Sequence, residues 1–442
     1  MNRSIVPTAL VRRAVECPRM SWWQTRLRSA CLGALRQHSE LRLEWTDALG
    51  TESVGSSEER PVRVTVHDPA IYRRMMTGGS LGFADGYIQG EWECSSTPGV
   101  EGEPELTRLF RMVLRSGRVA DDVDGGLARL RGWASRIGHA LRANHRTGSR
   151  RNIAAHYDLG NDFFRLFLDE TMAYSSGVFE TPEATLHDAS VAKFDRLIAL
   201  LDLGASDHLL EIGTGWGGFA IHAARETGCR ITTTTISQEQ YDLARKRIEE
   251  AGLSERIDVR LEDYRDLDGT YDKAIAIEMI EAVGHKFLPT FFGTVAERLR
   301  PGGALALQAI TMPDHRYERY LRSTDFIRTH VFPGSCVPSV SAMTSAATKG
   351  SDFRLTSMHD IGPHYAPTLR EWRRRFHERQ DEVLDLGYPE PFLRLWDYYL
   401  CYCEAGFAER YTGEVQMLLT RPGYRVEGTS GDCSVPTEGA RR

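Results

Sequence analysis

The segment LLEIGTGWGGFA at residues 209–220 combines an apolar run, a carboxylate and a cluster of glycines. Gly213, Gly215 and Gly218 have the GxGxxG spacing, and Gly217 lies beside the last of them. A glycine-rich turn between a strand and a helix lets backbone N–H groups lie close to a nucleotide-like ligand. The segment therefore predicts a cofactor loop.

The residues around this loop indicate which cofactor it holds. NAD requires an acidic residue about 20 positions further on, at the end of the second strand. Thr235 and Ile236 occupy that place and Glu239 is the nearest carboxylate, so NAD is disfavoured. Glu211 lies just before the glycines and favours S-adenosylmethionine (SAM), because a carboxylate complements the positive amino-acid end of that cofactor. The alternative is that Glu211 caps the following helix.

A second signal is the segment DYRDL at residues 263–267. It ends the third expected strand, where a SAM fold contacts the adenine ring and its exocyclic amine. Asp263 and Tyr264 suit that contact, although both are also common turn residues. Together with Glu211 they predict SAM as the cofactor.

The composition is that of a globular protein with two or three domains. The 442 residues are 41% hydrophobic and 26% charged, and the net charge of −6 gives no general case for a nucleic-acid partner. No apolar stretch approaches the roughly 20 residues that span a bilayer, and the N-terminus has no signal-peptide pattern. Eight scattered cysteines fit a reducing cytoplasm better than a disulfide framework.

Arginine recurs from Arg108 to Arg151 against few acidic residues. One interpretation is a solvated helix face. The other is a surface attracted to anionic lipid headgroups, since each basic residue near a membrane contributes about 1 kcal/mol. Composition leaves both open.

The chain divides into five expected segments. Residues 1–20 and 426–442 have the composition of disordered tails. The segment 21–105 alternates like strands and predicts a small mixed domain, with a polar loop at 51–60. A basic helical connector at 106–150 then leads to a catalytic domain at 151–425.

The catalytic domain shows strands separated by helices of regular length. The expected strands lie at 207–212, 230–236, 257–262, 273–278, 304–310, 353–358 and 414–420. The expected helices lie at 186–201, 216–226, 238–251, 286–299, 368–386 and 391–409. This alternation predicts a parallel sheet with both faces covered. Residues 311–350 interrupt it and are expected to build the substrate pocket.

Several longer motifs appear in one order along the chain. They lie at 78–92 (GGSLGFADGYIQGEW), 155–179, 210–218, 235–240, 263–267, 278–284 (EMIEAVG), 332–339 and 398–407. In these motifs the chain resembles cyclopropane-fatty-acyl-phospholipid synthases, relatives of the mycolic acid cyclopropane synthases, over roughly 60–425. The resemblance implies a class I SAM-dependent methyltransferase fold, an α/β Rossmann-like sheet with helical lipid-pocket insertions.

The resemblance also implies an activity. The methyl of SAM becomes the methylene bridge across a cis double bond of a phospholipid acyl chain. The alkene attacks the methyl, and the resulting carbocation must be kept from water until a base removes a proton. The implied cofactor contacts are Tyr174, Ser175, Glu211, Gly213, Gly215, Trp216, Gly217, Gly218, Thr235, Ile236, Gln240, Asp263, Tyr264 and Arg265.

In the family this base is thought to be a bound bicarbonate. Carried over by motif, its ligands are Glu281, Tyr365 and the backbone of Ser176 and Ile310. A histidine of the family is replaced by Gln308, which donates a hydrogen bond but cannot exchange a proton. His359 and His364 are candidates to contribute in its place. The last candidate catalytic residue is Cys403, for which a structural role is favoured.

The simpler alternatives are that Tyr365 is a core tyrosine and Glu281 a helix-start carboxylate. Three competing functions also remain. The same cation gives a methylene- or methyl-branched chain if it loses a neighbouring proton, and Gln308 makes this credible. The others are a small-molecule methyltransferase and a binding module without catalysis. The expected setting is the cytoplasm, peripheral to the inner membrane face, and a homodimer is possible from relatives alone.

Overall fold

The computed structural model describes residues 20–38, 40–56, 58–95, 102–116 and 159–425. They belong to two compact units, Met1–Arg129 and Leu130–Arg442, which are described one at a time. The expected tails and most of the expected connector lie outside the described residues.

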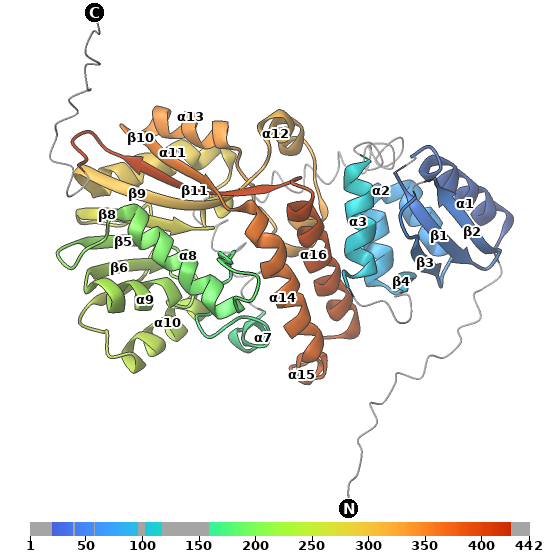
Figure 1. Cartoon of the computed structure of the whole chain (residues 1–442), viewed down its shortest axis with the longest axis horizontal. Coiled ribbons are helices and arrows are strands. Elements are labelled where there is room, and N and C mark those ends of the chain that lie inside the picture. The colour runs from blue at the N-terminus through green and yellow to red at the C-terminus, as the bar shows by residue number, and fades with distance from the viewer. Residues whose placement is uncertain (1–19, 39, 57, 96–101, 117–158, 426–442) are drawn as a thin grey trace, which may run out of the picture. The chain divides into compact units, whose positions relative to one another are not determined.

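The first unit contains a four-stranded sheet in the order β2-β1-β3-β4 (Figure 1). Its elements are α1 (Trp22–Leu35), β1 (Arg42–Asp47), β2 (Gly50–Gly55), β3 (Val62–Val66), α2 (Ala70–Ile88), β4 (Trp92–Ser95) and α3 (Glu105–Arg115). β1 pairs antiparallel with β2 and parallel with β3. The prediction of a polar loop at 51–60 is wrong for residues 51–55, which belong to β2. β2 is an edge strand, so its exposed positions are polar, while its Val54 is fully buried.

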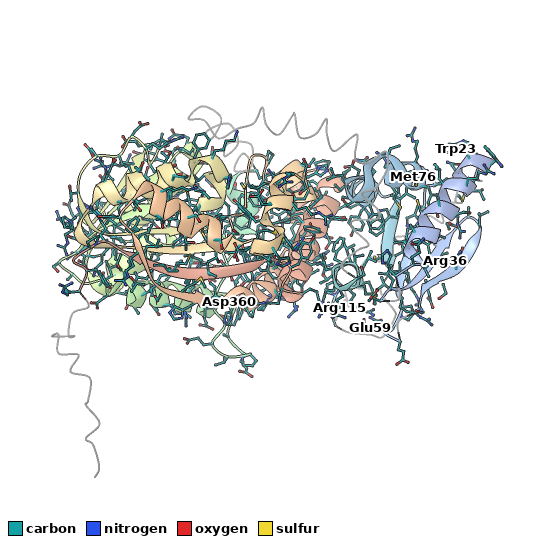
Figure 2. The ribbon with its side chains drawn as sticks, turned by 90° about the horizontal axis from the view of Figure 1, so that it is seen from above. Trp23, Arg36, Glu59, Met76, Arg115 and Asp360 are labelled. Carbon is teal, nitrogen blue, oxygen red and sulfur yellow. The ribbon has the colours of Figure 1, made fainter. Side chains whose placement is uncertain are left out.

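The arginines of α3 are paired within this unit. Arg108 bonds Glu105 at 2.8 Å, and Arg111 bonds Glu103 at 2.8 Å. Arg115 bonds Glu59 at 2.8 Å, and Figure 2 shows these two side chains side by side. For the described part of the arginine-rich segment, the basic groups therefore face acidic partners of the same unit. The arginines from 118 to 151 lie outside the described residues.

The second unit is built on a seven-stranded sheet in the order β10-β11-β9-β8-β5-β6-β7 (Figure 1). The strands are β5 (His208–Ile212), β6 (Arg230–Thr235), β7 (Ile257–Leu261), β8 (Tyr271–Ile277), β9 (Leu299–Thr311), β10 (Arg354–Asp360) and β11 (Gly413–Thr420). The five strands from β7 to β9 in this order are parallel, as expected. The final strand is not part of that pattern, because β11 runs antiparallel to both of its neighbours.

Helices cover both faces of this sheet. The described helices of this unit are α7 (Asn161–Arg165), α8 (Leu186–Leu201), α9 (Gly218–Thr227), α10 (Gln238–Glu250), α11 (Leu288–Arg298), α12 (Asp314–Leu321), α13 (Val340–Gly350), α14 (Tyr365–Glu378), α15 (Gln380–Asp385) and α16 (Glu390–Ala408). Shorter turns are η1 (Ile280–Ala282), η2 (His285–Phe287), the π-helical η3 (Ile327–Val331) and η4 (Gly362–His364). The expected helix at 368–386 is two helices, since the backbone leaves the helical region at Arg379.

The apolar run before the glycine loop explains why both faces are covered. Leu210 packs with Phe291 of α11 and Met343 of α13 in one core, whereas its neighbour Leu209 packs with Phe194 and Phe219 in the other. Successive side chains of a strand point to opposite faces, so a continuous apolar run needs helices on both sides. The two cores hold β5 in the middle of the sheet.

The carboxyl ends of the parallel strands meet at one edge of the sheet. β5 ends at the glycine loop and β8 ends immediately before Glu278. The antiparallel β11 brings two more polar residues there, because Gln416 lies opposite Gln308 and Glu414 lies opposite Ile310 on β9. Among the described helices, no segment has the length and apolar character needed to cross a bilayer.

Candidate active site

The glycine loop has the backbone that its sequence predicts. Gly213, Gly215 and Gly217 have φ angles of 102°, 51° and 81°, which side chains with a Cβ rarely adopt. Gly217 is the N-cap of α9, and Gly218 begins that helix. A Cβ at Gly218 would lie 2.3 Å from the carbonyl oxygen of Thr171. The loop therefore requires glycine both for its conformation and for close packing.

Replacing Gly218 by alanine is expected to lower the free energy of unfolding by about 1–3 kcal/mol, the usual cost of overpacking. The Thr171 carbonyl belongs to the backbone and cannot turn away as a side chain would. Thermal unfolding without ligand measures the effect. Gly33→Ala in α1 is the control, since a Cβ there meets nothing within 4 Å. Equal melting temperatures for the two variants would contradict the prediction.

Glu211 is buried at the end of β5, with 3% of its surface exposed. Burial raises the pKa of its carboxyl to about 8, opposed by a hydrogen bond from Thr233. Its Oε2 has no hydrogen-bond partner within the described chain. The helix-cap alternative is wrong, because α9 is capped by Gly217 and no side chain bonds its first N–H groups. An unpartnered buried carboxyl beside a glycine loop fits the ammonium group of SAM.

The other expected cofactor residues surround this loop. At the end of β6, Thr235 donates to the side-chain oxygen of Gln240 at 2.8 Å, and Ile236 is half-buried. At the end of β7, Asp263 accepts two hydrogen bonds from the Arg265 guanidinium, at 2.8 and 2.6 Å. The first of these ends carries no carboxylate for a ribose, which agrees with the case against NAD.

Aromatic side chains border the same region. Tyr264 packs against Phe291 with ring centroids 5.6 Å apart. Tyr174 bonds the hydroxyl of Tyr399 at 2.9 Å and lies 5.1 Å from the ring of Trp372. Trp216 of the loop donates to the Asn161 side chain at 2.6 Å, which links the loop to α7. Asn161 was not predicted from the sequence, since nothing near it marks it as a partner of Trp216.

The centre of the site is a carboxylate that was not predicted. Glu278 follows β8 and accepts hydrogen bonds from the backbone N–H of Ser176 at 2.8 Å, from Gln308 Nε2 at 3.0 Å and from the Tyr365 hydroxyl at 2.7 Å. Gln308 also donates to Glu414 at 2.9 Å. Glu278 lies within the motif EMIEAVG, but no feature of the sequence separates it from an ordinary loop residue.

Glu281 occupies η1 and bonds a different backbone group. Its Oε1 accepts from the Ile310 N–H at 2.7 Å, whereas its Oε2 has no partner in the described residues. Burial, followed by the nearby charge of Glu278, raises the pKa of Glu281 to about 8. The structure therefore brings Glu281, Tyr365, Gln308, Ser176 and Ile310 together, as the sequence predicts.

A buried lysine balances these acids. Lys193 of α8 is fully buried, and its Nζ donates to the hydroxyl of Ser175 at 2.6 Å. Burial lowers the pKa of Lys193, and the neighbouring Glu278, Glu414 and Asp169 oppose that shift. Lys193 was expected only as a member of a helix, because the sequence does not show that its position faces the carboxylates.

The expected bicarbonate ligands do not fit a bound bicarbonate in this arrangement. The Ser176 N–H, the Gln308 amide and the Tyr365 hydroxyl all donate to Glu278, and the Ile310 N–H donates to Glu281. A second anion there would lie against a protein carboxylate and would take donors from it, both of which are unfavourable. Carboxylates of the chain itself therefore occupy the place expected for the bicarbonate.

The remaining candidates lie outside this cluster. His364 Nδ1 faces the backbone N–H of Phe179 at 3.2 Å, and burial lowers the pKa of its ring. His359 is exposed on the edge strand β10, so it is not a substitute for the missing histidine. Burial raises the pKa of the Cys403 thiol, which keeps it protonated and agrees with the favoured structural role.

The sequence matches to known proteins agree with one another. The sequence profile of the family described as "Mycolic acid cyclopropane synthetase" matches residues 144–417. "Tuberculostearic acid methyltransferase UfaA1" of Mycobacterium tuberculosis is 40% identical over 394 residues, which cover 87% of this chain and 89% of the relative. The "Cyclopropane-fatty-acyl-phospholipid synthase" of Escherichia coli K12 is 31% identical over 377 residues, covering 85% of this chain and 92% of the relative.

Solved structures agree with the sequence matches. The cyclopropane synthase MmaA2 from Mycobacterium tuberculosis superposes with a TM-score of 0.58 and 30% identity, covering 62% of this chain and 98% of its own. The mycolic acid cyclopropane synthase CmaA1, solved with SAH and CTAB, gives a TM-score of 0.58 and 29% identity with the same coverage. These matches confirm the predicted class I SAM-dependent methyltransferase fold. The chain belongs to the mycolic acid cyclopropane synthetase family, and it is a SAM-dependent enzyme of carbon transfer to lipid acyl chains.

Proposed function

We propose that the protein transfers the methyl carbon of SAM to a cis double bond in an unsaturated acyl chain of a membrane phospholipid, and that the cation formed closes to a cyclopropane ring. The observation that carries the proposal is the hydrogen-bonded carboxylate cluster around Glu278. It lies at the edge of the sheet that also holds the glycine loop. A carboxylate there supplies what the reaction needs after methyl transfer, namely a base close to a cationic chain.

The chain's own residues explain how such a cation survives. SAM, when bound, supplies an activated methyl on a good leaving group. Tyr174, Trp372 and Tyr399 form an aromatic cluster that Phe164 joins to Trp216 of the cofactor loop. Tyr365 stacks on Phe407 with ring centroids 4.3 Å apart. Aromatic faces attract cations and exclude water, which otherwise captures a carbocation. Glu211 would hold the ammonium of SAM, and Asp263 and Tyr264 would hold its adenine.

A phospholipid substrate determines where the enzyme works. The acyl chain must pass from a membrane into the site, so we place the protein in the cytoplasm, in peripheral contact with the inner membrane face. The E. coli relative is named for a fatty-acyl-phospholipid, and CmaA1 was solved with CTAB. Both facts support a substrate with a long alkyl chain. By analogy with related enzymes, we also propose that the protein forms a homodimer.

A second candidate product is a methylene- or methyl-branched chain. It arises from the same cation in one of two ways. Loss of a proton from the neighbouring carbon leaves a methyl-branched alkene, whereas a 1,2-hydride shift followed by loss of a proton from the added methyl leaves an exocyclic methylene. Two observations favour it: UfaA1 is named a methyltransferase of tuberculostearic acid, and the site carries Gln308, which cannot take up a proton. All of these products share the methyl-transfer step and the cation that it forms.

Incubation of the purified protein with SAM and vesicles of a cis-monounsaturated phospholipid tests the proposal. Mass spectrometry should show acyl chains that have gained one CH₂. Proton NMR then separates the products, because cyclopropane ring protons resonate far upfield whereas an exocyclic methylene gives vinyl signals. Unchanged chains in the presence of bound SAM would refute both candidates. Turnover of a water-soluble acceptor without vesicles would instead indicate a small-molecule methyltransferase.

A further inference from the structure

We propose that Glu278 is the catalytic base of this enzyme, a carboxylate of the protein that occupies the position of a freely bound anion. The proposal rests on the proposed function above for the reaction it serves. That Glu278 already fills the position of an anion is a separate claim, which holds whatever reaction the enzyme catalyses.

The backbone at Glu278 is held in an unusual conformation. Its φ is 48°, in the left-handed region that residues other than glycine, asparagine and aspartate rarely adopt. The Glu278 N–H donates to the carbonyl oxygen of Gln308 at 2.9 Å, which fixes this turn against β9. Strained backbone of this kind persists where the surrounding structure over-determines it, and it clusters at functional sites. Here it aims one carboxylate into the cluster.

The donors around Glu278 are those expected to bind an anion. Oε1 accepts from the Ser176 N–H and from Gln308 Nε2, and Oε2 accepts from the Tyr365 hydroxyl. Gln308 is in turn fixed by Gln416, whose amide donates to its Oε1 at 2.9 Å. Three donors converging on one carboxylate hold both of its oxygens in place. The glutamine is well suited to this role, because its amide donates without competing for a proton.

Glu278 is also the least buried of the three glutamates in the cluster. It is half-buried, whereas Glu281 is 8% exposed and Glu414 is fully buried. Burial raises the pKa of both of these neighbours, that of Glu281 to about 8. With a pKa of about 8, Glu281 carries a proton at neutral pH, and the buried Lys193 lies near Glu278.

The proton lost in ring closure needs no acceptor other than the Glu278 carboxylate. In methyl transfer the alkene electron pair forms the new C–C bond, and the C–S pair stays with sulfur. A C–H bond of the transferred carbon then breaks, its electron pair closes the ring, and its proton moves to the Glu278 carboxylate. The carboxylic acid formed returns the proton to solvent after the product leaves. No oxidant or further anion is needed.

The first test compares two variants of neighbouring glutamates. Glu278→Gln keeps the shape and the hydrogen-bond capacity, since the Tyr365 hydroxyl can accept from the new amide, but it removes the base. Turnover of phospholipid vesicles should fall about 10²–10⁴-fold, the usual contribution of a general base. Glu281→Gln replaces an already neutral acid and should cost about tenfold or less, the worth of one hydrogen bond. A larger loss in Glu281→Gln than in Glu278→Gln would overturn the proposal.

The second test uses bicarbonate itself as the probe. Glu278→Gly vacates the carboxylate position and accepts the left-handed backbone without strain. In NMR titrations ¹³C-labelled bicarbonate should bind Glu278→Gly and not the unaltered protein. Added bicarbonate should raise the turnover of Glu278→Gly, and removal of CO₂ should leave the unaltered enzyme at full rate. Loss of the unaltered enzyme's activity without CO₂, or bicarbonate binding to it, would show that a free anion is the base.

Calorimetric SAM affinity and the melting temperature of each variant show that the fold is intact. If the unaltered protein binds SAM but gives no lipid product, the proposed function fails. The bicarbonate titration still decides whether Glu278 fills the anion position, because it requires no turnover. The two failures are therefore distinguishable.

Discussion

Replacing Lys193 by methionine is expected to lower the free energy of unfolding by about 3–5 kcal/mol, the cost of removing one partner from a buried group of charges. The Lys193 side chain is fully buried, and its ammonium bonds the Ser175 hydroxyl. Its charge interacts with Glu278, Glu414 and Asp169. Methionine fills a similar volume but leaves these acids without a cation. The Ser175 hydroxyl loses its donor at the same time.

Urea unfolding with and without the change measures this loss. Lys246→Met is the matched control, because Lys246 is exposed and its pairing with Glu250 is at 3.8 Å. An exposed pair of this kind contributes about 0–1 kcal/mol. A loss for Lys193→Met as small as that for Lys246→Met would show that the buried acids do not depend on the lysine.

The second large effect is expected on cofactor binding. Glu211→Gln should raise the dissociation constant of SAM about 10–100-fold, because a hydrogen bond to a charged group is worth about 1.5–3 kcal/mol. The unpartnered Oε2 of Glu211 is the group that SAM's ammonium would meet. Isothermal titration calorimetry measures the change. Glu250→Gln is the control, since that carboxylate is exposed. Equal affinity in all three proteins would remove Glu211 from the cofactor site.

The raised pKa of Glu211 adds a pH dependence with a definite sign. In the free protein its pKa is about 8, so below that pH the carboxyl carries a proton that must leave before it can pair with an ammonium. SAM affinity should therefore rise with pH between about 5.5 and 7.5, where an amino group stays charged. Binding should release protons in the same range. Glu211→Gln should abolish both effects.

The sequence predicted the parts of the molecule that depend on local pattern. The glycine loop, its carboxylate and the alternation of strands and helices are set by residues close together in the chain, where spacing and propensity act directly. The motif resemblance added Glu281, Tyr365 and Gln308, which the structure brings together.

The sequence did not predict the site residues that come from distant segments of the chain. Glu414 joins the site because β11 is antiparallel to β9 and puts Glu414 opposite Ile310. Lys193 reaches it from α8, and Asn161 meets Trp216 from α7. None of these contacts has a local signature, because each depends on register and packing between distant segments. The same limit applies to the helix break at Arg379, where no proline or glycine marks the boundary.

The left-handed backbone at Glu278 has a consequence for the evolution of such enzymes. Its φ of 48° is one that glycine adopts freely, and glycine and glutamate codons differ by a single nucleotide. With the role that we propose for Glu278, one point mutation to glycine would replace a base of the protein by a site open to dissolved bicarbonate. The sheet and the cofactor loop would be unchanged.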